Sequence, residues 1–77
     1  MKDRMMSLLK GIRSDIDFEA STTLIDHKIL SSLDIIQVIS GIEEEFNIEI
    51  PVEDIKPENL NSVDAMVEMV EQLVKMK

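Results

Sequence analysis

Apolar residues recur at helical spacing in three separate stretches of this 77-residue chain. The first stretch holds Met5, Leu8, Leu9 and Ile12, which fall on one face of a helix over about residues 2–13. The whole chain has only two Gly and two Pro. That is too few turn-forming residues for a β-sandwich. We therefore predict an all-α fold.

The second predicted helix begins at Ser31 and ends at Asn47. Ser31 suits the N-cap, and Asp34 stands three residues later, where a capping box places its acid. Its inward stripe is made of Ile35, Val38, Ile39, Ile42 and Phe46. The side opposite this stripe holds Leu33, Gln37, Ser40, Gly41 and Glu44. Leu33 is therefore expected to project away from the core, with Ile36 at the flank.

Two further segments complete the predicted fold. Pro51 and Pro57 suit the first turns of short helices, so residues 52–60 should form one or two such turns. The last helix is expected to start at Asn61 or Ser62 and to run to about Met76. The residues of both segments that are expected to face inward are Val52, Ile55, Leu60, Val63, Met66, Val67, Val70, Leu73 and Val74.

Together these elements predict a small four-helix bundle, with three longer helices and one short one, that forms a single domain over residues 1–77. Residues 14–30 show no steady period and form a long loop between the first two helices. Loops of this length in compact domains are uncommon and often functional. The loop should be held to the core by its apolar residues, which are Ile16, Phe18, Leu24, Ile25, Ile29 and Leu30.

The charge of the chain argues against several kinds of partner. Sixteen acids against eight bases give a net charge of −8, which disfavours nucleic acids and anionic membrane surfaces. Residues 14–64 hold thirteen of these acids and two bases, so a positively charged partner is expected there. No apolar run approaches the roughly 18 residues of a membrane span, and no export signal is visible. We therefore expect a cytoplasmic protein.

The residue types leave little for catalysis or metal binding. The chain has no Cys, a single His at position 27, and no Gly-rich phosphate loop. Glu43, Glu44 and Glu45 are adjacent on the second helix, so their carboxylates point about 100° apart and cannot converge on one ion. We expect these three side chains to form a solvated face, and the protein not to be an enzyme or to hold a metal.

Two serines stand side by side at the start of the second helix. Only one of them is needed as the N-cap, although capping alone accounts for both. Ser32 lies in the first turn, where the helix dipole and free N–H groups would favour an attached phosphate ester.

Longer stretches resemble a known family. One stretch is the run Leu30-Ser31-Ser32-Leu33-Asp34-Ile35-Ile36. It resembles the Asp-Ser-Leu signature that opens the second helix of acyl carrier proteins. Residues 42–51 are similar to that family's glutamate-rich helix end, followed by Phe and then Ile-Pro. Residues 61–65 resemble the entry into its last helix. The resemblance covers about residues 24–74.

The resemblance implies that Ser32 carries 4′-phosphopantetheine, transferred from coenzyme A by a phosphopantetheinyl transferase. The arm would bring the thiol that this chain lacks, and acyl or aminoacyl intermediates would be held on it as thioesters. The chain would then present them, as a monomer, to loading and processing enzymes with basic docking patches, in fatty-acid or specialised-metabolite biosynthesis. The matching recognition positions are Leu33, Asp34, Ile36, Gln37, Glu43 and Glu44.

Two positions depart from the family pattern. Ser31 stands where Asp usually precedes the modified serine, and Gln37 replaces an acid that is common in fatty-acid carriers. A D-alanyl or aminoacyl carrier of cell-wall or nonribosomal peptide pathways is therefore an alternative. A second alternative is a small acidic helical adaptor without a prosthetic group, in which Ser32 stays unmodified.

Overall fold

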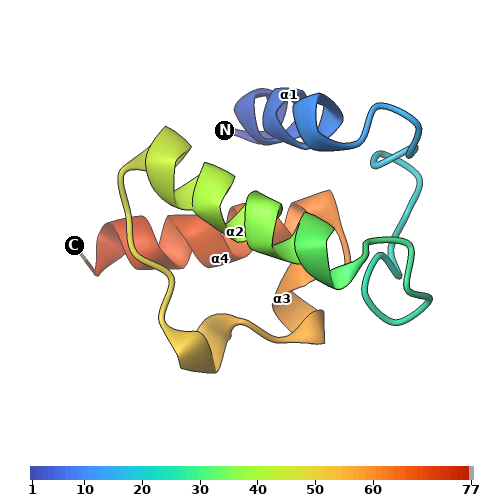
Figure 1. Cartoon of the computed structure of the whole chain (residues 1–77). Helices are drawn as coiled ribbons and strands as arrows, with labels where there is room; N and C mark the ends of the chain where they lie inside the picture. The colour runs from blue at the N-terminus through green and yellow to red at the C-terminus, as the bar shows by residue number, and fades with distance from the viewer. Residues whose placement is uncertain (77) are drawn as a thin grey trace.

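Four α-helices make up the fold of residues 1–76, the part of the chain that this computed structural model describes. Within those residues there is no β-strand, so the predicted all-α bundle is confirmed. Figure 1 shows α2 crossing in front of α4, with α1 along one side and the short α3 on the other. The helices and the one 3₁₀ turn are α1 (Lys2–Ile12), α2 (Ser32–Phe46), the turn Val52–Asp54, α3 (Pro57–Leu60) and α4 (Val63–Lys75).

The limits of α2 follow from residues at its two ends. Ser31 and Asp34 form the predicted capping box, so the N-terminal N–H groups gain acceptors from within the helix's own first turn. Asn47 adopts the left-handed conformation, with φ 53°, and its backbone N–H donates to the carbonyl of Glu43. Asn tolerates this conformation better than most residues, and it ends the helix there.

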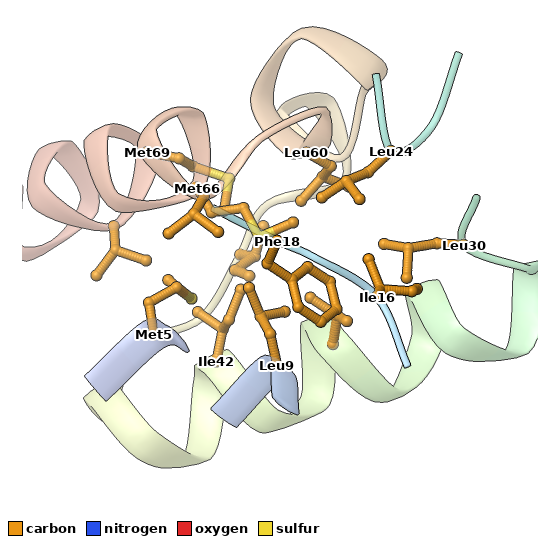
Figure 2. Packing of buried hydrophobic residues seen from close by; sticks show 14 of the residues in the cluster. Met5, Leu9, Ile16, Phe18, Leu24, Leu30, Ile42, Leu60, Met66 and Met69 are labelled. Carbon is orange, nitrogen blue, oxygen red and sulfur yellow. The ribbon is translucent and has the colours of Figure 1, made fainter. Parts of the chain in front are cut away.

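The hydrophobic core draws on all four helices and on the long loop. Figure 2 shows Phe18 of the loop among Met5 and Leu9 of α1, Ile42 of α2 and Met66 of α4. Each of these five side chains is at most 1% exposed. Ile16, Leu24 and Leu30 of the loop are also buried, and Ile25 and Ile29 pack against the core. The prediction that apolar residues hold this loop to the bundle is confirmed.

Asn61 provides a polar anchor for the same loop. Its side-chain Oδ1 accepts hydrogen bonds from the backbone N–H groups of Ile25 and Asp26, at 2.9 and 3.0 Å. Its backbone carbonyl accepts from the N–H of Leu24 at 2.9 Å. Ser62, the other expected cap, is the one that caps α4 by accepting from the N–H of Ala65.

Three residues expected in the core lie at the surface instead. Val52 is 82% exposed, and Ile55 is 37% exposed, because the 3₁₀ turn lies on the outside and the preceding extended residues, Ile48 and Ile50, fill the core. Val74 is 44% exposed, because the buried stripe of α4 continues through Met69 and leaves the last turn at its edge.

The side of α2 opposite its core stripe is also partly covered. A Cβ added to Gly41 would lie 2.7 Å from Cδ1 of Leu8, so α1 approaches α2 closely there. The expectation that Gly41 faces away from packed residues is therefore wrong. The absence of a side chain at this position is what gives Leu8 room between the two helices.

Candidate functional site

The two adjacent serines at the start of α2 have different roles in the structure. Ser31 Oγ accepts a hydrogen bond from the N–H of Asp34, and Asp34 Oδ2 accepts one from the N–H of Ser31, each at 3.1 Å. Ser32 is the first residue of α2 and is exposed, and its hydroxyl makes no hydrogen bond within the described residues. Capping therefore occupies the Ser31 hydroxyl and leaves that of Ser32 available.

Arg13, the residue that follows α1, binds two carboxylates beside this helix start. Its Nη1 donates to Asp34 Oδ2 at 2.6 Å. Its Nε and Nη2 donate to the two oxygens of Asp15, at 3.0 and 2.9 Å. The result is a chain of hydrogen bonds that runs from Asp15 through Arg13 and Asp34 to Ser31.

This network shifts the ionisation of both acids in the same direction. The bond from the Ser31 N–H lowers the pKa of Asp34 most, partial burial opposes that effect, and Arg13 lowers the pKa further. The guanidinium of Arg13 lowers the pKa of Asp15 to about 2. The hydrogen bond to Asp15 raises the pKa of Arg13 most, and the hydrogen bond to Asp34 raises it further. All three groups are therefore charged at neutral pH.

An apolar strip lies next to Ser32 on the outer face of α2. Leu33 is 64% exposed and Ile36 is 60% exposed. Gln37 and Glu44 are exposed as well, one and three turns further along the helix. The prediction that Leu33 projects away from the core is confirmed.

Two of the six candidate recognition residues do not point freely outward. Asp34 is only 9% exposed, because its position in the capping box turns its carboxylate back toward Ser31 and Arg13. Glu43 is half-buried, and its Oε2 accepts from the backbone N–H of Ile50 at 2.9 Å. Glu44 and Glu45 are exposed, as expected for a solvated face, and Glu45 also pairs with Arg4 at the surface. The expectation of a solvated side chain is wrong only for Glu43.

The contacts that sequence reasoning missed are those of Arg13 and Asn61. Arg13 is the last residue of the helix predicted over about residues 2–13, and its closeness in sequence to Asp15 is the one local signal for their pairing. Its bond to Asp34 spans 21 residues and becomes visible only in the fold.

Within residues 1–76 no group of three or more His, Cys, Asp or Glu side chains is placed to hold a metal ion. No helix of the described part is long and apolar enough to span a membrane.

Comparison with known proteins identifies the family. The family described as "Phosphopantetheine attachment site" matches residues 5–70. The chain belongs to the acyl carrier protein family. Aminoacyl carrier protein 1 of Bradyrhizobium diazoefficiens is 35% identical to this carrier over 74 residues, which cover 91% of this chain and 81% of the relative. No solved structure matches the carrier. Proteins of this family are not themselves catalytic, and their prosthetic group is 4′-phosphopantetheine.

The start of α2 fits this prosthetic group. An exposed serine hydroxyl without a hydrogen-bond partner in the described residues is available for a phosphate ester. The N-terminal end of a 15-residue helix favours the negative charge of that ester. Because the chain has no Cys, the thiol for a thioester has to come from the prosthetic group.

Proposed function

We propose that Ser32 is the attachment residue of 4′-phosphopantetheine and that residues 1–77 form a single carrier domain for aminoacyl or acyl thioesters. The observation that carries the proposal is the difference between the two serines. Ser31 Oγ is held in the cap, whereas Ser32 is exposed and its hydroxyl is without a partner in the described part of the chain. This difference argues against the adaptor alternative, in which both serines serve only the helix start.

Modification requires Ser32 to act as a nucleophile toward coenzyme A. Its Oγ attacks the phosphorus nearer the pantetheine, an Oγ–P bond forms, and the bond from that phosphorus to the pyrophosphate oxygen breaks. Adenosine 3′,5′-bisphosphate leaves with the electrons of the broken bond, and the hydroxyl proton passes to a base of the transferase. The arm, once bound, supplies the thiol that holds the cargo. The helix end stabilises the resulting phosphodiester electrostatically.

We assign the cargo to the aminoacyl class. The name of the Bradyrhizobium relative supports this choice, and so do the two departures from the fatty-acid pattern at Ser31 and Gln37. Fatty-acyl cargo is the competing assignment. The net charge of −8 supports partners that have basic docking patches. These partners would contact the outer face of α2 at Leu33, Ile36, Gln37 and Glu44. The carrier itself would be a cytoplasmic monomer.

Intact-protein mass spectrometry tests the attachment residue. Incubated with coenzyme A and a broad-specificity phosphopantetheinyl transferase, the wild-type protein should gain the mass of one arm. Ser32→Ala should gain none. Ser31→Ala is the matched control and should still be modified, with a loss of about 1 kcal/mol of stability from the missing cap. Modification at Ser31, or none when a known carrier in the same tube is modified, contradicts the proposal.

The same measurement on protein purified from its native host tests the cargo. An aminoacyl thioester adds the mass of an amino-acid residue to the arm, and hydroxylamine releases it. An added mass that corresponds to a fatty acyl chain contradicts the aminoacyl assignment but leaves the attachment at Ser32 intact.

A further inference from the structure

Arg13 joins the end of α1 to the beginning of α2. Its backbone N–H donates to the carbonyl of Leu9 at 2.9 Å and so belongs to the last turn of α1. Its guanidinium meets Asp34, in the first turn of α2, at 2.6 Å. This contact closes the long loop at the point where Ser32 stands.

The environment of Asp34 makes this contact important. The side chain of Asp34 is 12% exposed, and its Oδ2 accepts from both Arg13 and the N–H of Ser31. A carboxylate with so little access to water requires a charged partner, because an unpaired charge in a poorly hydrated place is costly. With Arg13 present, Asp34 stays ionised and holds Ser31. Ser32 then lies in a turn in which Ser31 and Asp34 are both held by hydrogen bonds.

Asp15 fixes the guanidinium from its other edge. Both oxygens of Asp15 accept from Arg13, and the bidentate pair sets the plane of the guanidinium. Lys in place of Arg13 would keep the positive charge but would lose the planar, forked set of N–H donors. An ammonium group cannot bind two carboxylates with that geometry. The network is therefore specific for Arg.

We propose that Arg13 is a positioning residue for the modification of Ser32, acting through Asp34 and Ser31 without touching the reacting atoms. The inference rests on the attachment at Ser32 proposed above. In-line attack of Ser32 Oγ on phosphorus depends on where the first turn of α2 holds it, and a displacement of about 1 Å can slow such a step roughly a hundredfold. Arg13 also offsets the negative charge of Asp34, which lies two residues from Ser32. This reduces the repulsion of the strongly anionic coenzyme A as it approaches the Ser32 hydroxyl.

The test is the steady-state kinetics of modification of the full chain, with coenzyme A saturating and carrier concentration varied. Arg13→Gln should lower kcat about tenfold or more, as expected for a misplaced nucleophile, with a smaller change in KM. Arg13→Lys should recover part of the loss. Arg4→Gln is the matched control, because it removes the same charge from α1 and breaks the pair with Glu45 at the far end of α2. Its kcat should stay close to the wild-type value.

Circular dichroism at the assay temperature identifies the folded variants, and the assay is run well below the lowest melting temperature. A merely structural role for Arg13 would lower stability but leave the kcat of the folded protein unchanged, and that result overturns the inference. If Arg13→Gln does not fold, Arg13→Lys decides: a kcat below the wild-type value supports positioning, and an equal kcat overturns it. Wild-type protein that is not modified at Ser32 overturns the proposed function itself, whereas modified wild type with an unaffected Arg13→Gln overturns this inference alone.

Discussion

Arg4, in the first turn of α1, donates from Nη2 to both the carboxylate and the backbone carbonyl of Glu45, in the last turn of α2, at 2.7 and 2.8 Å. The same guanidinium lies 4.8 Å over the ring of Phe46. At the other end of both helices Arg13 binds Asp34. Two arginines thus fix α1 and α2 antiparallel, and one of the two contacts lies beside Ser32.

The acids held by Arg13 make part of the stability depend on pH. The pKa of Asp34 is lowered by the fold, and that of Asp15 is lowered to about 2, so the unfolded chain binds protons more readily than the folded one. Their contribution is therefore present above about pH 5 and is lost as the pH falls toward 2. We expect the free energy of unfolding in urea to fall over this range, and to fall less in Arg13→Gln. Parallel curves for the two proteins would contradict this assignment.

A pair of substitutions on α2 separates its inner face from its outer one. Ile42 is fully buried, so Ile42→Ala should destabilise the fold by about 2–5 kcal/mol through lost burial and a cavity. Leu33 is 64% exposed, so Leu33→Ala should change stability by less than about 0.5 kcal/mol. Urea denaturation of both variants measures the difference. A large loss in Leu33→Ala would place that side chain in the core.

The helices were predictable because their signals are local. The spacing of apolar residues and the Ser31–Asp34 capping box gave the limits of α2 to within a residue, and Phe18 was correctly expected to hold the loop to the core. The exposure of Val52 was not predictable in the same way, because a single turn has too few residues to show a period.

The candidate site was predictable only in part. Ser32 was selected by its place at the helix start and by the family signature, both of which lie in neighbouring residues. The partners of Asp34 and Glu43 come instead from Arg13, 21 residues away, and from Ile50, across the turn that ends α2. Such contacts depend on how the chain returns on itself, so the sequence did not show that both carboxylates are engaged within the chain.

The excess of acids should make stability depend on ionic strength. The ion pairs in residues 1–76 engage Asp15, Asp34, Glu45 and Asp64, which leaves most of the sixteen acids without a cationic partner there. Salt weakens these pairs but also relieves the repulsion of the larger unpaired set. We expect the melting temperature near pH 7 to rise with added NaCl or Mg²⁺. A flat or falling response to both would mean that the pairs outweigh the repulsion.

Binding kinetics with a transferase that has a basic docking patch test the outer face of α2. Rim charges mainly set the rate of association, whereas a central apolar contact mainly sets dissociation. Glu44→Lys should therefore slow association and flatten its dependence on salt. Leu33→Ala should chiefly speed dissociation, at a cost of about 1–2 kcal/mol in binding.

Glu71→Lys supplies the matched control for Glu44→Lys, because it makes the same charge change on an exposed position of α4. Surface plasmon resonance at two or more salt concentrations gives both rate constants for each variant. If the transferase docks on α2, Glu44→Lys should slow association more than Glu71→Lys does. At physiological salt, screening over about 8 Å weakens the interaction of the transferase with a charge outside the contact surface. Equal slowing by both substitutions would mean that the net charge of the carrier, rather than the face beside Ser32, steers the transferase.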